Sequence, residues 1–124
     1  MSSTVLKKDR TRKAGHFMED YRSKIVSPEQ AAALIRSNDR IFTGGGVNIP
    51  IAFATALGAR AKELENITIY QGYGMALYEY MKPEVKDTFN IETMFVGPLE
   101  RICMEWGVGS YKPHSFSDLG AAAL

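Results

Sequence analysis

A run of three glycines is the part of this sequence best suited to hold a small charged ligand. Gly44, Gly45 and Gly46 directly follow a short β-rich run, and Asn48 and Pro50 begin a predicted helix. Glycines let a ligand approach the backbone, and the free N–H groups and dipole of the helix point at the same place. Such a corner can hold a phosphate, a carboxylate or a developing oxyanion. A tight turn without a ligand explains the glycines equally well, and their spacing matches neither nucleotide-binding loop motif.

Two further predicted strands end in residues that we expect near this glycine turn. Gln71 and Gly72 follow the second predicted strand, and Gly97 follows the third. Because the carboxyl ends of parallel strands share one edge of a sheet, the three loops are predicted to meet there. The functional interpretation is a shared cleft lined by Gln71, Tyr73, Met75 and Gly97. The alternative is that these residues are ordinary loop positions between strands and helices.

The other reactive residue types do not form a recognisable catalytic or metal-binding set. Cys103 falls on the apolar face of a predicted helix, where a packed thiol is expected rather than a nucleophile. Glu100 and Glu105 flank that face, and we expect both to be solvated. His16 and His114 have no cysteine or histidine at metal-ligand spacing, so we expect no metal site.

Helix and strand signals alternate along the chain. Helices are predicted at 28–37, after a capping box, from about 50 to 64, and from Pro98 until Gly107. Short β-rich runs occupy 41–43, 67–70 and 93–96, with a last short strand around 114–116. This alternation implies right-handed crossovers. We therefore predict the α/β class, with a mainly parallel sheet covered by helices and one exposed sheet edge.

The composition describes one globular domain behind a basic arm. The 124 residues are 45% hydrophobic, which is enough for one core, and the net charge of +1 gives no field to attract nucleic acid or a membrane. Residues 1–26 show no sustained period. We interpret residues 1–20 as a solvated arm rather than a transit peptide, because the arm contains Asp9, Glu19 and Asp20. A single cysteine favours a reducing, cytoplasmic compartment.

The glycine turn belongs to an ordered series of short motifs. The series comprises the segment 21–32, Leu34-Ile35, Asp39-Arg40-Ile41-Phe42, the glycines with Pro50, Glu63-Leu64-Glu65-Asn66-Ile67-Thr68 and Phe95-Val96-Gly97-Pro98. The order and spacing of these motifs, over about residues 20–120, resemble the opening of the acetyl-CoA hydrolase/transferase family. That family includes 4-hydroxybutyrate, butyrate and acetate CoA-transferases.

The resemblance implies that residues 21–124 form a CoA-transferase-like N-terminal α/β domain that is incomplete. In the family, a glutamate of the C-terminal half attacks an acyl-CoA thioester and later carries CoA as a glutamyl thioester, which a second carboxylate resolves. No glutamate in this chain lies in a matching context. The resemblance therefore implies that this half lines the acyl or carboxylate pocket. The residues expected to line it are Gly44, Gly45, Gly46, Asn48, Pro50, Gln71, Gly72 and Gly97.

The predicted function is thus the N-terminal part of an enzyme that transfers CoA between an acyl-CoA and a small carboxylate, with no bound cofactor. The expected partners are these substrates and a C-terminal catalytic domain or partner subunit, and assembly as a homo-oligomer stays open. The alternatives are a non-catalytic anion-binding domain and one subunit of a split CoA-transferase. The run at 121–124, which lacks a polar stop, favours a fragment, and the isolated chain is expected to be inactive.

Overall fold

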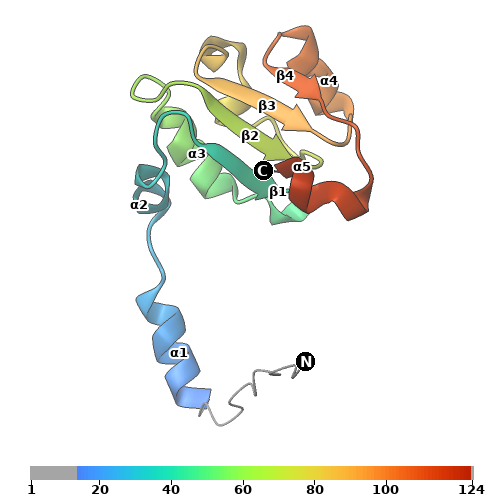
Figure 1. Ribbon diagram of the computed structural model, residues 1–124. Helices are drawn as coiled ribbons and strands as arrows, with labels where there is room; N and C mark the ends of the chain where they lie inside the picture. Colours follow the sequence, from blue (N-terminus) through green and yellow to red (C-terminus); the bar gives the residue numbers. More distant parts are fainter. Residues whose placement is uncertain (1–13, 124) are drawn as a thin grey trace, which may run out of the picture.

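Four parallel strands in sequential order form the sheet at the centre of the molecule (Figure 1). The computed structural model describes residues 14–123. The strands are β1 (Arg40–Gly44), β2 (Ile67–Gln71), β3 (Phe89–Thr93) and β4 (Gly109–Tyr111), and each pairs in parallel with the next. The predicted α/β class and parallel sheet are confirmed.

The sequential strand order places the crossovers on one face of the sheet. Right-handed connections between successive parallel strands all turn toward the same side when the strands follow one another in order. The crossovers contain α3 (Ile51–Ala59), the connection 72–88 and α4 (Pro98–Glu105). The prediction that helices cover the sheet therefore holds for one face.

The covered face supplies most of the hydrophobic core. Ile41, Ile69 and Ile91 are lateral neighbours in the strand register. They pack in one cluster with Leu57 of α3 and Cys103 of α4. Because full burial of an isoleucine or leucine side chain contributes about 1.5–3 kcal/mol, this stripe across the strands fixes the helices against the sheet.

The opposite face of the sheet carries a polar cluster. Arg40 and Lys112 both form ion pairs with Glu92, and the Lys112 Nζ lies 3.4 Å from Glu92 Oε2. Tyr70 is fully buried beside this cluster, and its hydroxyl lies 2.6 Å from Nε2 of His114. Burial raises the pKa of Tyr70, and the nearby negative charge of Glu92 adds to the shift.

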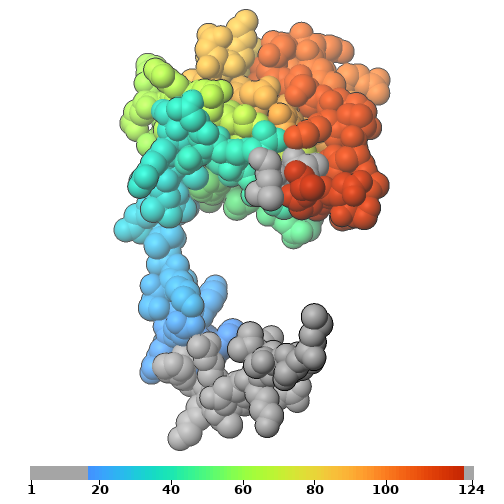
Figure 2. All heavy atoms as spheres, in the orientation of Figure 1, coloured from blue at the N-terminus to red at the C-terminus, as the bar shows by residue number. Residues whose placement is uncertain are grey.

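The remaining elements are short. They are α1 (Ala14–Ser23), α2 (Pro28–Ala33), η1 (Gly46–Asn48), η2 (Glu79–Met81), η3 (Pro83–Val85), η4 (Phe116–Asp118) and α5 (Leu119–Ala123). Figures 1 and 2 show α1 standing apart from the body that holds the sheet. None of the helices within residues 14–123 combines the length and apolar character needed to cross a bilayer.

The helix α1 corrects the expectation that residues 1–26 have no periodic structure. Phe17 and Tyr21 lie one turn apart on this helix and are both exposed, at 61% and 58%. An ion pair between Lys24 Nζ and Asp20 Oδ2, at 2.9 Å, supports its last turn. The large apolar residues of α1, Phe17, Met18 and Tyr21, span little more than one turn, which is too short to give a sustained helical period. The part of the predicted arm at 1–13 lies outside the described residues.

Two predicted strands were misplaced. The third strand was predicted at 93–96 but ends at Thr93, and Phe95 is 47% exposed. The true strand alternates inward Phe89 and Ile91 with more polar outward residues, and this pattern of period two is what a half-buried strand requires. The last strand lies at Gly109–Tyr111 instead of around 114–116.

Two predicted helices were too long. The first ends at Ala33, although the capping box formed by Ser27 and Gln30 is present as predicted. The second begins after Pro50, which is its N-cap, so Asn48 lies in η1 and does not cap the helix. The second also ends at Ala59 rather than near residue 64. The helix α4 was predicted correctly between Gly97 and Gly107.

Candidate functional site

The glycine turn is held against the loop after β2 by backbone contacts. The N–H of Gly46 donates to the carbonyl oxygen of Tyr73 at 2.6 Å, and the N–H of Gly72 donates to that of Gly44 at 2.8 Å. Gly44 and Gly46 have φ angles of +84° and +60°, in the left-handed region that favours glycine. A Cβ on Gly45 would lie only 3.2 Å from the Cα of Gly72. A tight turn and a close loop contact therefore account for all three glycines.

A pocket of about 350 Å³ opens beside this turn, at the carboxyl edge of the sheet. It is lined by Phe42, Gly44, Gly45, Asn48, Gly72, Tyr73, Met94, Phe95, Phe116 and Leu119. Glycine backbone forms one wall, and large apolar side chains form much of the rest. No residue of this lining is charged. An apolar pocket with a few polar groups is the usual form of a small-molecule site.

The pocket brings together half of the residues predicted for the site. Gly44, Gly45, Asn48 and Gly72 line it, and so does Tyr73. These residues come from the ends of β1 and β2 and from η1. The loops after the first two strands therefore meet at one edge, which is the arrangement expected for parallel strands.

The other predicted residues lie around the pocket. Gly46 completes the turn, and Pro50 lines a neighbouring hollow together with Asn48 and Phe53. Gly97 lies behind Tyr73: a Cβ on Gly97 would come within 2.5 Å of the tyrosine Cε2.

Gln71 points into the core and does not line the cleft. Its side chain is fully buried, and its Oε1 accepts a hydrogen bond from the Tyr80 hydroxyl at 3.1 Å. Burial also raises the pKa of Tyr80, so this hydroxyl stays protonated and can donate. Met75 is 60% exposed and is not part of the lining. Of the four residues expected to share a cleft, only Tyr73 lines the pocket.

The sequence did not identify the apolar wall of the pocket. That wall is formed by Phe42, Met94, Phe95, Phe116 and Leu119. The rings of Phe95 and Phe116 lie 6.3 Å apart, so the segment after β4 closes one side. This contact joins distant parts of the chain and leaves no local pattern. Phe42 and Met94 could have been proposed, because each stands at the carboxyl end of a strand.

Glu100 is buried, which corrects the expectation that it is solvated. Only 1% of the residue is exposed. The N–H of Gly74 donates to Oε1 at 2.7 Å, and the N–H of Gly97 donates to Oε2 at 3.0 Å. The contact with Gly97 is the part of a capping box in which a third-position glutamate reaches back to the N-cap. Glu105 is exposed, as expected.

Cys103 is a packed thiol, as predicted. It is 1% exposed in the core between α4 and the sheet. Burial raises the pKa of this thiol to about 11, and the negative charge of Glu100 contributes to the shift. A thiol with this pKa is neutral at physiological pH and is a poor nucleophile.

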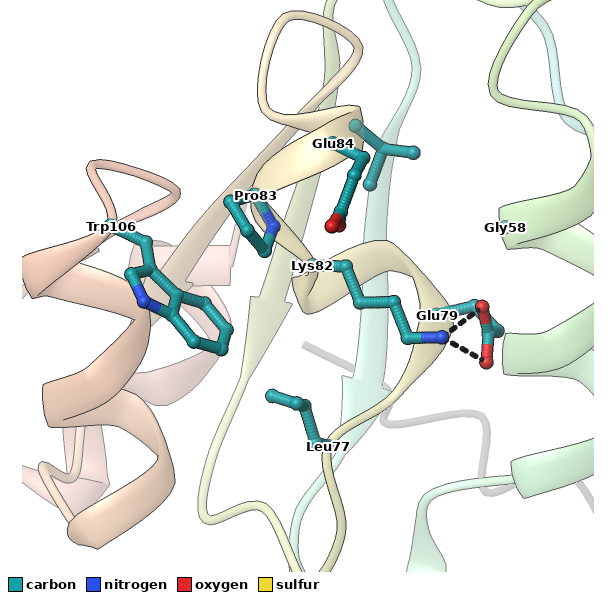
Figure 3. Close-up of a pocket in the computed structure, with 8 residues that line it drawn as sticks. Gly58, Leu77, Glu79, Lys82, Pro83, Glu84 and Trp106 are labelled. Carbon is teal, nitrogen blue, oxygen red and sulfur yellow. Dashed lines mark hydrogen bonds and ion pairs between the residues drawn. The ribbon is translucent and has the colours of Figure 1, made fainter.

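A second hollow of about 570 Å³ lies on the helix-covered side of the molecule (Figure 3). It contains Trp106, Pro83 and Leu77 together with charged side chains, and none of the predicted site residues. Lys82 donates from Nζ to both carboxylate oxygens of Glu79, at 2.8 and 2.7 Å. Because a second acid, Glu84, also lines the hollow, its net charge is negative and unsuited to the phosphates of CoA.

Comparisons with solved structures confirm the fold. The crystal structure of RipA from Yersinia pestis superposes with a TM-score of 0.67 at 23% sequence identity. The match covers 82% of this chain and 26% of that chain.

Curated relatives carry CoA-transferase names. The chain is 34% identical over 104 residues to the butyryl-CoA:acetate CoA-transferase of Anaerostipes caccae. It is 27% identical over 103 residues to the succinyl-CoA:cyclohexane-1-carboxylate CoA transferase of Geobacter metallireducens. Each match covers 83% of this chain and 23% of the relative, so the chain spans about a quarter of the length of these relatives.

The family model for the acetyl-CoA hydrolase/transferase N-terminal domain matches residues 6–123. This match includes every strand of the sheet and all the residues that line the pocket at its carboxyl edge. The chain belongs to the acetyl-CoA hydrolase/transferase family and carries its N-terminal domain.

Proposed function

We propose that this chain is the N-terminal part of an enzyme that transfers CoA between an acyl-CoA and a small carboxylate. The observation that carries the proposal is the uncharged pocket at the carboxyl edge of the sheet, in a chain of this family. Open α/β sheets bind their ligands at this edge. The names of the curated relatives describe the same class of reaction.

In this proposal the pocket holds the acyl group of the thioester or the accepting carboxylate. The apolar wall that includes Phe95 and Phe116 contacts the hydrocarbon part, and the glycine turn lets the reacting carbonyl approach the backbone. The protein excludes water from the reacting group on this side, which favours transfer to a carboxylate over hydrolysis.

The nucleophile is proposed to lie outside residues 1–124. No carboxylate among residues 14–123 lines the pocket, and Glu100, which lies behind its wall, has both oxygens engaged by backbone N–H groups. The glutamate of the remaining polypeptide or of a partner subunit would attack the thioester carbonyl. The C–S bond then breaks, CoA leaves as a thiolate, and an acyl-glutamyl anhydride forms.

The CoA thiolate next attacks the glutamyl carbonyl of the anhydride, which releases the first carboxylate and leaves a glutamyl-CoA thioester. The accepting carboxylate reverses these two steps and leaves as the new acyl-CoA. The chain described here contributes orientation and desolvation to both halves of the reaction. A cytoplasmic location fits a single cysteine that is buried and reduced.

The test is a transfer assay on the natural polypeptide that carries residues 1–124. The purified protein is incubated with butyryl-CoA and acetate, and acetyl-CoA and free CoA are measured by chromatography. We expect acetyl-CoA to accumulate and free CoA to stay low. The 124-residue chain alone is expected to produce neither. If the natural polypeptide transfers CoA from no short-chain acyl-CoA to any carboxylate acceptor, the proposal is wrong.

A further inference from the structure

We propose that Glu100 is a positioning residue that fixes Tyr73 as a wall of the pocket. The inference rests on the proposed function, because it gives a role to a residue outside the lining of that same pocket. Glu100 belongs to α4, whereas Tyr73 belongs to the loop after β2, so the carboxylate acts between two separate loops.

Each oxygen of the carboxylate holds a different loop. Oε1 accepts from the N–H of Gly74, which directly follows Tyr73, and Oε2 accepts from the N–H of Gly97, at the start of α4. With Glu100 only 1% exposed, water does not compete for these bonds. The residues Gly74 and Gly97 are distant in sequence, and one side chain ties them together.

The packing around this carboxylate leaves little freedom. A Cβ on Gly97 would come within 2.5 Å of Tyr73 Cε2 and 2.9 Å of Glu100 Oε2. A Cβ on Gly74 would come within 2.7 Å of Glu100 Oε1. The tyrosine ring therefore lies directly against the backbone at Gly97. Because Gly74 and Gly97 have no side chains, there is room for the carboxylate between them.

A carboxylate is the side chain that this position requires. It offers two acceptor oxygens and no donor, so it can satisfy two N–H groups that face it. A glutamine of the same shape offers one acceptor, and its NH₂ group would face one of the N–H groups.

A helix cap alone does not explain this arrangement. A capping role accounts for the bond from Gly97, which lies within the first turn of α4. It does not account for the bond from Gly74. The two roles therefore make different predictions for the loop that carries Tyr73.

The test compares Glu100→Gln with Glu105→Gln in the natural polypeptide that carries the domain. Glu105 lies on the same helix and is exposed, which makes it a matched control. Glu100→Gln removes a hydrogen bond to a charged group that holds the loop carrying Tyr73, so other loop conformations become populated. We expect the KM for acyl-CoA to rise by about tenfold while kcat falls less. With ¹⁵N-glycine labelling, the amide signals of both Gly74 and Gly97 should move in Glu100→Gln and stay in place in Glu105→Gln.

We call the contacts of Glu100 with Gly74 and Gly97 the clamp. Three results would decide against the clamp or against the proposed function. A change at the Gly97 signal alone, with KM unchanged, would reduce Glu100 to a helix cap. If Glu100→Gln does not fold, amide exchange in the unmodified protein decides, because the clamp predicts slow exchange at Gly74 and fast exchange there would overturn it. If the unmodified protein transfers no CoA, the proposed function fails, and the Gly74 signal still tests the clamp.

Discussion

Glu100 and Cys103 lie one turn apart on α4, and burial affects them differently. The carboxylate has two N–H partners, which offset the loss of water around its charge. For the thiol, burial outweighs the backbone hydrogen bond that favours its charged form. Its environment is the core, with a long contact of 3.8 Å from Sγ to the carbonyl oxygen of Met81. Glu100 is therefore buried with both oxygens hydrogen-bonded, whereas the buried thiol of Cys103 is kept neutral at physiological pH.

The raised pKa of Cys103 predicts slow chemical modification. With a pKa of about 11 against an ordinary 9.0, the thiolate is about 100-fold rarer at a given pH, and burial slows access further. Iodoacetamide should alkylate Cys103 at least about 100-fold faster in denaturant than in buffer. Since it is the only cysteine, intact mass reports the reaction directly. Equal rates in the two conditions would mean that the thiol is accessible.

The raised pKa of Cys103 also makes the free energy of unfolding depend on pH. The pKa is higher in the folded chain than its ordinary value, so folding favours the neutral thiol. This contribution is fully present below pH 9 and is lost as the pH rises through about 11. Replacing Cys103 with Ala should remove this part of the alkaline loss of stability.

Among the elements, some glycines mark close approaches between neighbours and others do not. Gly58 of α3 lies against η2, where a Cβ would come within 2.3 Å of the Cβ of Glu79. Gly120 of α5 has open space around it, with no atom within 4 Å of a Cβ. Alanine at Gly120 therefore tests the gain in helix propensity alone, whereas alanine at Gly58 tests the same gain against a steric clash.

We expect Gly58→Ala to destabilise the fold and Gly120→Ala to leave it unchanged or slightly more stable. Alanine in a helix is favoured over glycine by about 1 kcal/mol. At Gly58 the clash outweighs this gain, because overpacking costs about 1–3 kcal/mol. Chemical denaturation of both variants gives the difference. A Gly58→Ala variant as stable as the parent would show that α3 and η2 can separate freely.

The segment after β4 is the element that closes the apolar wall of the pocket. It is held by the Tyr70–His114 hydrogen bond at 2.6 Å and by the contact between Phe95 and Phe116. His114 Nδ1 lies 2.9 Å from the carbonyl oxygen of Lys112, which leaves Nε2 to accept from the tyrosine hydroxyl.

Replacing Tyr70 with Phe should loosen this segment while keeping the ring contact with Phe42. Loss of one such bond costs about 1 kcal/mol. We expect faster hydrogen–deuterium exchange over 112–119 and unchanged exchange in α2. Unchanged exchange over 112–119 would show that the aromatic contact alone holds the segment.

Elements with strong local signals could be predicted, and elements fixed by distant contacts could not. The start of α4 followed from Gly97 and Pro98, and its end from Gly107, whose φ of +72° suits glycine. The end of β3 was missed because Met94 and Phe95 read as strand residues. Both residues instead line the pocket, beside the segment after β4 for which the sequence predicts a strand around 114–116.

In the molecule as a whole, the crossover helices cover one face of the sheet, whereas the other face carries the Glu92 cluster and contacts the segment after β4. This asymmetry follows from the sequential strand order, which turns every crossover to the same side. Parallel sheets usually have both faces covered. The glycine side of the pocket could be predicted from motifs at strand ends, whereas its apolar side depends on long-range packing.

We propose above that this domain shapes the pocket while a glutamate beyond residues 1–124 carries the CoA. The most direct measurement is to incubate the natural polypeptide with acyl-CoA and trap the glutamyl-CoA thioester with hydroxylamine, which displaces CoA and leaves a hydroxamate. Peptide mapping by mass spectrometry then locates the modified residue. We expect a single hydroxamate outside residues 1–124. A hydroxamate on a glutamate within residues 1–124 would contradict it.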